Sequence, residues 1–246
     1  MKKKNICLCT CFPVRNFFHS LSIKLYSLLV SLYTCSCNQI ILKVEHTTMT
    51  NFLDAIKNRR SIYALGRNVT LSESQIEELI KEAVKASPSA FNAQSARAVI
   101  LFGDAHEKLW DLTADALEPL TPADAFEGTK QKLGSFKAGF GTVLFFFDQD
   151  TVTGLQEQFA LYAENFPVWA EQSNGIAQAN TWTALSEAGI GASLQHYNPV
   201  IDEAVAKEWN IPANWKLRSQ LVFGSKEADA GEKEFLADDV RFRTFK

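Results

Sequence analysis

The segment from Val168 to Ala188 constrains the fold most strongly, because only two of its 21 residues, Glu171 and Glu187, are charged. Small and apolar residues recur in it at helical spacing, which predicts one long helix. They include Ile176, Ala177, Asn180, Thr181, Ala184, Leu185 and Ala188. A helix with no polar face is buried in a globular protein. We therefore expect either a central core helix or a helix at a subunit interface.

Three other apolar segments predict β-strands, at residues 96–102, 141–148 and 217–224. The segment 141–148 is apolar almost throughout, so we expect it in the middle of a sheet with helices on both faces. The segment 96–102 is also expected to be buried. Helical patterns occupy residues 52–56, 72–86, 105–117, 121–140 and 201–209, with glycines interrupting the fourth of them.

The composition changes near residue 48. All five cysteines precede this point, and the only methionines are Met1 and Met49. The first 48 residues carry six basic residues and one acidic residue, or +5, which leaves −8 for the other 198 because the whole chain carries −3. A cysteine-free acidic body is expected in the cytoplasm. Its charge argues against nucleic acid or an anionic membrane as a partner.

The first 48 residues allow several interpretations. A basic start followed by the apolar stretch 17–33 is similar to a signal peptide, but Lys24 and several serines interrupt it and no clean cleavage site follows. The same interruptions argue against a membrane helix. Tyr33 is too bulky for a lipid-attachment site, and the cysteines lack partners at metal-ligand spacing. We favour the interpretation that residues 1–48 are an extension outside the fold, and upstream sequence translated in error is one possible origin. The folded domain, residues 49–246, would then begin near Met49.

Two polar clusters are candidates for ligand binding. Arg59-Arg60-Ser61 follows the first helix, and it is either a solvated helix end or a phosphate site, since guanidinium groups match phosphate oxygens in two-point geometry. Ser87–Ser95 joins a helix to a strand, and Pro88 ends that helix. Its small polar residues suit a flat polar ligand, although most loops only connect elements.

Two more polar segments lie further along the chain. In Gly189–Pro199, the first glycine is placed to cap the long helix, and Gly191 allows close approach of backbone to a ligand. A lone histidine such as His196 is more often structural, but its polar neighbours favour a polar lining. In the tail, Arg241 and Arg243 alternate with a phenylalanine, so on a strand both arginines would point the same way.

Several catalytic motifs are absent from the sequence. We find no phosphate loop, no dinucleotide glycine fingerprint, no HExxH and no serine-nucleophile elbow. Residues 49–246 contain no cysteine and only two histidines, His106 and His196. Acyl transfer and metal hydrolysis therefore lack their usual groups, and no metal site is expected. An organic cofactor that does the chemistry fits better.

Four motifs in this order resemble the nitroreductase family of flavoenzymes. Arg59–Ser61 resembles its opening phosphate-binding motif, and Ser87–Gln94 is similar to its P-S-x-x-N-x-Q flavin-contact motif. Gly189–Gly191 and Leu194–Pro199 are similar to the fatty-acid-repression and Hbn-like subgroup. The closing Arg241–Arg243 matches the C-terminal basic pair. The resemblance runs from about Thr50 to the end.

The resemblance implies an α+β fold with a central, mostly antiparallel sheet flanked by helices. It also implies an intertwined homodimer with two FMN sites at the interface. The helix Val168–Ala188 would form the dimer core, and the tail would cross to the partner.

The resemblance further implies FMN-binding roles for Arg59, Arg60, Ser61, Asn92, Gln94, Gln195, His196, Arg241 and Arg243. The first three and the last two would hold the phosphate end. Asn92 and Gln94 would hydrogen-bond the edge of the flavin ring, and Gln195 and His196 would lie near the ring.

The chain departs from the family pattern at two positions. Many members have Pro-Trp after the Asn-x-Gln, where this chain has Ser95 followed by alanine and Arg97. Many also have a lysine where Tyr63 stands, and that lysine is expected to stabilise negative charge on reduced flavin. We expect Arg97 to replace it, the alternative being a salt bridge at a strand edge.

The implied activity is reduction of nitroaromatics or quinones in two steps. NADH or NADPH reduces FMN and leaves, and the acceptor then takes the electrons, so no side-chain nucleophile is needed. The sequence does not distinguish the two nucleotides. The alternative is a non-catalytic regulatory protein on the same scaffold that responds to flavin or lipid.

Overall fold

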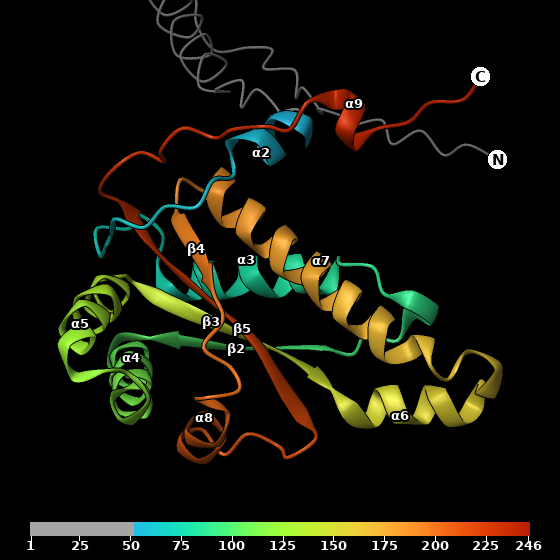
Figure 1. Ribbon diagram of the computed structural model, residues 1–246, viewed down its shortest axis with the longest axis horizontal. Coiled ribbons are helices and arrows are strands. Elements are labelled where there is room, and N and C mark those ends of the chain that lie inside the picture. Colours follow the sequence, from blue (N-terminus) through green and yellow to red (C-terminus); the bar gives the residue numbers. More distant parts are fainter. Residues whose placement is uncertain (1–51) are drawn as a thin grey trace, which may run out of the picture. The chain divides into compact units, whose positions relative to one another are not determined.

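The computed structural model describes residues 52–246, in which helices cover a five-stranded sheet (Figure 1). The strands are β1 (Leu65–Gly66), β2 (Ala96–Phe102), β3 (Gly141–Asp148), β4 (Gly191–Gln195) and β5 (Trp215–Lys226). The α-helices are α2 (Phe52–Asn58), α3 (Glu73–Lys85), α4 (Gly103–Leu117), α5 (Ala123–Lys137), α6 (Gln149–Gln158), α7 (Asn165–Glu187), α8 (Asp202–Glu208) and α9 (Asp238–Arg241). Three single 3₁₀ turns are η1 (Ala90–Asn92), η2 (Glu118–Leu120) and η3 (Ala160–Tyr162). The predictions for residues 1–48 and for Met49 lie outside the described residues.

The sheet has the order β1-β5-β3-β2, with β4 also paired to β5, and every strand pair is antiparallel. Strand β3 pairs on both edges, and all eight of its residues are buried, which confirms the central strand expected from its apolar run. Strand β2 is an edge strand within the described chain, and only Leu101 in it is buried. The buried strand expected at 96–102 is therefore wrong for the single chain, because nothing pairs with its second edge there.

Helices cover the two faces of the sheet in separate groups (Figure 1). On one face, α3 and α7 cover Val143 and Phe145 of β3. On the other, α4, α5 and α8 cover Leu144 and Phe146. This alternation is the two-residue period of a strand, and it makes both faces of β3 part of a core. The fold is thus the helix-flanked, mostly antiparallel sheet that the motifs implied.

The helix α7 is the long, nearly uncharged helix predicted from the sequence, and it is buried along one side only. Its buried residues include Ala170, Asn174 and Ala177, and Asn174 donates a hydrogen bond of 2.7 Å to the carbonyl of Phe146. On the other side Val168 is 54% exposed, and Ile176 is 39% exposed. Within residues 52–246, α7 is therefore a core helix with an uncovered apolar face.

Local signals in the sequence account for several element ends. Ser72 and Gln75 form the capping box that starts α3. Gly189 has φ of 79° directly after α7, and the amide of Ile190 bonds to the carbonyl of Leu185 at 2.9 Å. This is the left-handed cap expected at that glycine. The helix α5 runs unbroken through Gly128, although its glycines suggested interruptions.

The tail differs from the strand considered for it. Arg241 ends the short helix α9, and the amide of Phe242 bonds to the carbonyl of Asp238 at 2.8 Å. No strand of the described chain pairs with this segment. Because no strand pairs with it, local hydrogen bonds determine its conformation. The alternation of arginine and phenylalanine therefore does not place the two arginines on one face of a strand.

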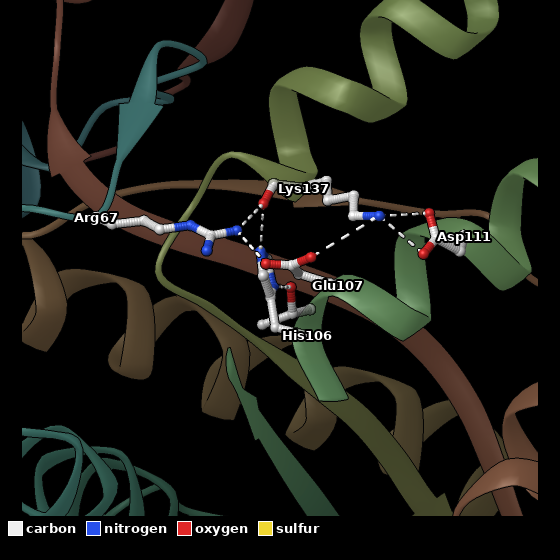
Figure 2. A network of polar contacts seen from close by, with 6 residues as sticks. Arg67, His106, Glu107, Asp111 and Lys137 are labelled. Carbon is white, nitrogen blue, oxygen red and sulfur yellow. Dashed lines mark hydrogen bonds and ion pairs between the residues drawn. The ribbon is translucent and has the colours of Figure 1, made fainter. Parts of the chain in front are cut away.

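A buried histidine links the α4–α5 layer to the sheet (Figure 2). The Nδ1 atom of His106 lies 2.9 Å from the hydroxyl of Thr142, and its Nε2 atom lies 3.3 Å from the carbonyl of Lys137. A carbonyl only accepts, so Nε2 carries the proton and Nδ1 accepts from Thr142. Around the ring, Arg67 bonds to Glu107 at 2.7 Å and to the same Lys137 carbonyl at 3.1 Å. The site is thus arranged for a neutral imidazole.

We expect the free energy of unfolding to fall between pH 6.5 and pH 4, partly through His106. Burial lowers its pKa from 6.5 to about 4. The unfolded chain therefore binds this proton at a higher pH than the folded chain does, so acid favours unfolding. The loss begins as the pH falls below 6.5 and reaches roughly 3 kcal/mol below pH 4.

Denaturant unfolding of the parent and of His106→Gln across this pH range measures the effect. Carboxylates such as Glu107 titrate in both proteins, so the difference between the two profiles isolates the histidine. Between pH 6.5 and pH 4, the free energy of unfolding of His106→Gln should fall by roughly 3 kcal/mol less than that of the parent. Parallel profiles would show that His106 is protonated as easily in the folded state as in the unfolded state.

Candidate functional site

The cluster Arg59-Arg60-Ser61 is held between the end of α2 and the sheet. The amide of Arg59 closes the last turn of α2 on Ala55 at 3.1 Å. Ser61 then forms a parallel bridge with Ala192 of β4, and the amide of Ile62 bonds to the Ala192 carbonyl at 2.9 Å. The cluster is therefore attached to the edge of the sheet.

Gly191 makes this attachment possible. A Cβ atom at Gly191 would lie 3.1 Å from the Cβ atom of Ile62 and 2.9 Å from the Cγ atom of Lys226. The close approach that this glycine permits is thus to the chain's own segment after Ser61, whereas the sequence suggested a ligand. The glycine still serves the candidate site, because it lets the arginine cluster dock against β4.

Arg59, Arg60 and Ser61 line a pocket of about 560 Å³, whose opposite wall is the start of the tail, residues 228–233. We call it the arginine pocket. Arg60 donates a hydrogen bond of 2.5 Å to the carbonyl of Gly231. Within residues 52–246, neither guanidinium is paired with a carboxylate. The pocket therefore has two guanidinium groups and a hydroxyl on one wall, and Lys233 together with the carboxylates Asp229 and Glu232 on the other.

The guanidinium of Arg59 lies over the ring of Trp182, 4.4 Å from the ring centre. Trp182 comes from α7, and its indole Nε1 is buried without a hydrogen-bond partner among the described residues. Such stacking holds an arginine by cation–π attraction and leaves its N–H groups available. Both residues also line an apolar pocket of about 680 Å³ between α2 and α7.

The loop Ser87–Ser95 is tied to α3 and α7 by its first residue. The hydroxyl of Ser87 donates to the carbonyl of Ala83 at 2.8 Å and accepts from the side chain of Asn180 at 2.9 Å. Further on, the amide of Gln94 bonds to the hydroxyl of Ser89 at 2.9 Å. These bonds give the loop one defined path.

The backbone of this loop is unusual. Phe91, Asn92 and Gln94 have φ values of 56°, 49° and 49°, in the left-handed region that side chains other than glycine seldom adopt. Gln94 and Arg97 line a pocket of about 210 Å³ together with the serines at the start of the loop. Both amide side chains predicted to contact flavin thus sit on strained backbone, and Gln94 lies at a pocket.

Arg97 forms a salt bridge, which was the second interpretation of this residue. Its Nη2 atom lies 2.7 Å from the Oδ2 atom of Asp148, and its Nη1 atom bonds to the carbonyl of Gln94 at 2.7 Å. Arg97 therefore joins the loop to the end of β3. Its side chain is 29% exposed, so it can still face a ligand on its open side.

Asp148 receives four polar contacts. Besides Arg97, it accepts from the Thr151 hydroxyl at 2.9 Å, the Asn214 amide at 2.8 Å and the backbone of Asp150 at 3.1 Å. Burial would raise the pKa of this carboxyl, but the bond from Thr151 and the charge of Arg97 outweigh it, and the pKa lies below its usual value. Asp148 is thus a stable anion.

The remaining predicted residues lie apart from the arginine pocket. Gln195 is buried at the end of β4 and donates to the hydroxyl of Ser193 at 3.1 Å, while His196 is exposed just beyond it. Among the described residues, Arg241 contacts the tail itself, where its guanidinium lies over the ring of Phe242. Arg243 bonds to the carbonyl of Asp239, also within the tail.

The single chain therefore brings some predicted residues together and leaves others apart. Arg59, Arg60 and Ser61 share one pocket, and Gln94 and Arg97 share another. Their joint assembly with the β4 end and the tail stays a prediction. In residues 52–246 no helix is long and apolar enough to cross a membrane, and no group of three or more potential metal-ligating side chains is found.

Three residues of these clusters were not singled out from the sequence: Trp182, Asp148 and Phe91. Trp182 lay within the uncharged helix, where an aromatic residue indicates core packing. Asp148 ended a strand, and its partner Arg97 is 51 positions away. The sequence marks Phe91 only as part of the loop motif, because the left-handed backbone of a phenylalanine has no signal in the sequence.

The sequence profile of the nitroreductase family matches residues 56–225. Together with the fold, this shows that the chain belongs to the nitroreductase family. Membership supports a flavin-dependent oxidoreductase.

Among its relatives are two proteins of Saccharomyces cerevisiae. HBN1 is 37% identical over 196 residues, covering 79% of this chain and 97% of the relative. The nitroreductase FRM2 is 36% identical over 188 residues, covering 76% and 93%. The solved nitroreductase CinD of Lactococcus lactis is 60% identical with a TM-score of 0.74, covering 80% of this chain and all of CinD.

Proposed function

We propose that this protein is an FMN-dependent oxidoreductase that uses NADH or NADPH to reduce nitroaromatics or quinones. The observation that carries the proposal is the arginine pocket. Arg59 and Arg60 form no salt bridge among the described residues, although Asp229 and Glu232 also line the pocket, and Ser61 adds a hydroxyl beside them. Paired guanidinium groups and a hydroxyl are a donor set that fits a phosphate monoester such as that of FMN.

The loop Ser87–Ser95 supplies groups of the kind that a flavin ring edge requires. The ring edge carries both donors and acceptors, and an amide side chain offers both. Asn92 and Gln94 are such amides on a loop of defined path. A nitroreductase-fold structure from Desulfovibrio desulfuricans, 21% identical with a TM-score of 0.56, contains FMN; it establishes the shared fold, and the case for FMN here rests on this chain's residues.

The proposal includes a homodimer. The apolar face of α7 with Val168 and Ile176, and the neighbouring Phe52 of α2, which is 71% exposed, are uncovered in the single chain. A second copy would bury these residues. It would also supply another loop and tail near the arginine pocket, which would explain why the predicted residues divide between pockets. Sedimentation of the purified protein as twice the chain mass would support this arrangement.

The proposed acceptors are small aromatic molecules. CinD, at 58–60% identity, has been solved with nicotinic acid, with chloramphenicol and with 4-nitrophenol. The last two are nitroaromatic compounds. Nicotinic acid has the pyridine ring of nicotinamide, with a carboxyl group in place of the amide. We also propose a cytoplasmic location, on the ground that residues 49–246 contain no cysteine.

The chemistry supplied by bound FMN is hydride acceptance from a nicotinamide and electron delivery to the acceptor. The chain's own residues then bind and orient. Arg59, Arg60 and Ser61 hold the phosphate end, and Trp182 holds the plane of Arg59. Asn92 and Gln94 hydrogen-bond the ring edge. Arg97 contributes positive charge from a fixed position, because it is also bonded to Asp148 and to the backbone carbonyls of Gln94 and Ala96.

An anaerobic titration tests the proposal. Purified protein should carry a visible flavin absorbance band, NADH or NADPH should bleach it, and 4-nitrophenol or a quinone should restore it. Protein that binds no FMN would refute the proposal. Protein that binds FMN and is bleached by neither nucleotide would favour a regulatory binder.

An Arg97→Ala substitution should lower turnover roughly tenfold, the scale of one lost charge-stabilising donor. The potential of the bound flavin should become more negative, since a cation near the ring favours the reduced anion. Arg97→Lys keeps the charge and should retain most of both properties. Turnover and flavin potential are measured at a temperature at which all three proteins are folded. If both are parent-like in Arg97→Ala, the role of Arg97 is limited to its salt bridge.

A further inference from the structure

We propose that Phe91 is a positioning residue whose ring holds the loop Ser87–Ser95 in the conformation that binds flavin. The inference rests on the proposed function and deepens it. The backbone of Phe91 has φ of 56° and ψ of 20°, and Asn92 and Gln94 are also left-handed. Such a conformation is unfavourable for a bulky side chain, so surrounding contacts must stabilise it.

The ring of Phe91 provides these contacts. It packs against four aromatic rings from the region between α6 and the first turns of α7. The ring centres lie 5.0 Å away for Phe159, 5.4 Å for Phe166, 5.9 Å for Trp169 and 6.3 Å for Tyr162. The Trp169 ring is stacked, with an interplanar angle of 20°. Aromatic pairs at these distances stabilise beyond the area they bury.

The underside of the loop fits this region closely. The space enclosed by Ala90 and Ala93 of the loop and by Val152, Phe166 and Trp169 is only about 10 Å³. That is at the lower limit of the volume that holds a single water molecule. Rotation of the loop would therefore open a cavity or expose Phe166, which is 3% exposed. Packing therefore opposes movement of the loop away from the aromatic region.

The position of Phe91 in the chain makes its ring decisive for the site. Asn92 follows it directly, and Gln94 lies three residues on, so both predicted flavin contacts take their direction from its backbone. The flanking bonds are local: Asn92 amide to the Ser89 carbonyl and Ala93 amide to the Ala90 carbonyl, both at 3.0 Å. Among the described residues, the ring of Phe91 makes the aromatic contacts between the middle of the loop and distant elements, beside the packing of Ala90 and Ala93. Without it, the loop would populate other conformations, and FMN binding would have to restore this one.

The first test needs no flavin. Hydrogen exchange of the Asn92, Ala93 and Gln94 amides is measured in the parent, in Phe91→Ala and in Phe91→Tyr. In Phe91→Ala we expect exchange about tenfold faster or more, because the ring no longer opposes opening of the loop. Phe91→Tyr keeps the ring, and Phe91 is 52% exposed, so a hydroxyl is accommodated and exchange stays parent-like. Unchanged exchange in Phe91→Ala would overturn the inference.

The second test follows FMN. The Kd of Phe91→Ala should rise roughly tenfold to a hundredfold, and the potential of its bound flavin should become more negative as ring-edge hydrogen bonds are lost. Phe91→Tyr should restore both. Phe126→Ala removes a half-buried phenylalanine from α5, outside the aromatic region, and serves as the matched control. Phe159→Leu removes the facing ring without altering the loop and should shift both quantities in the same direction as Phe91→Ala.

The outcomes distinguish FMN binding by the protein from the positioning role of Phe91. Parent protein that fails to bind FMN refutes the proposed function, while the exchange data still decide whether Phe91 anchors the loop. Parent-like Kd and potential in Phe91→Ala, with FMN bound by the parent, refute the positioning role alone. Faster exchange together with unchanged FMN binding refutes it as well, because the anchored conformation would then be irrelevant to flavin.

Discussion

Replacing Arg59 with alanine is expected to weaken FMN binding by roughly tenfold to a hundredfold, the worth of a hydrogen bond to a charged group. Arg59 is half-buried, and Trp182 holds its guanidinium plane at 4.4 Å. Little side-chain freedom is therefore lost when it binds a phosphate. The change is measured by flavin titration of the cofactor-free protein, and quenching of tryptophan fluorescence gives a second signal because Trp182 adjoins the site.

Two further variants make the result specific. Lys57→Ala removes a cation from α2 that lies 3.7 Å from Asp54 and is 73% exposed, and we expect no change in FMN affinity. Arg59→Lys keeps one charge but loses two-point geometry, and it should fall between the parent and Arg59→Ala. Equal affinities in the parent and Arg59→Ala would place the phosphate elsewhere.

Replacing Asp148 with alanine is expected to lower the free energy of unfolding by about 2–4 kcal/mol, from lost hydrogen bonds to a charged group and a lost helix N-cap. The Asp148 side chain is only 12% exposed, and its removal leaves Arg97 without its carboxylate. It also removes the N-cap of α6, since Asp148 accepts from the amide of Asp150. Denaturant unfolding followed by circular dichroism measures the loss.

The controls for this prediction vary charge and burial. Asp148→Asn keeps an acceptor oxygen for the cap and should cost less than alanine. Asp111→Ala also removes a carboxylate bonded to a cation, at 2.7 Å from Lys137, but Asp111 is 55% exposed. Exposed pairs contribute about 0–1 kcal/mol, so this variant should be close to the parent. A loss for Asp148→Ala no larger than that for Asp111→Ala would contradict the structural role.

The pH dependence of this ion pair has a definite sign. The pKa of Asp148 is below its usual value in the folded protein, so its contribution is present above the unfolded pKa of 3.8. It is lost as the pH falls through the folded pKa. The acid sensitivity from Asp148 therefore lies below that from His106, which begins near pH 6.5.

Much of the fold was predictable because its signals are local. The apolar run of β3, the capping box of α3 and the glycine after α7 all lie where the sequence placed them. Periodicity and capping depend on residues a few positions apart, so one sequence suffices to read them. The burial of β2 and of α7 was not predictable in the same way. Burial depends on what packs against an element, and in the single chain each has one uncovered side.

The candidate site was likewise predictable only in part. Residue types and order alone indicated Arg59-Arg60-Ser61, the loop with Asn92 and Gln94, and Arg97 as a cation with two interpretations. They also carried the resemblance to the nitroreductase family, which the family profile and the fold confirm. Short motifs can do this because the groups that bind one end of a ligand are often adjacent in the chain.

Only the tertiary structure decided how those groups are held. It attached Ser61 to β4, stacked Arg59 on Trp182 and paired Arg97 with Asp148. It also set the Phe91 ring among four aromatic rings on a left-handed backbone. These contacts join residues tens to more than a hundred positions apart, and their geometry depends on how helices and strands pack. The sequence by itself therefore determined which chemical groups are present and in what order, and the packed chain determined which of them are fixed and in what direction they face.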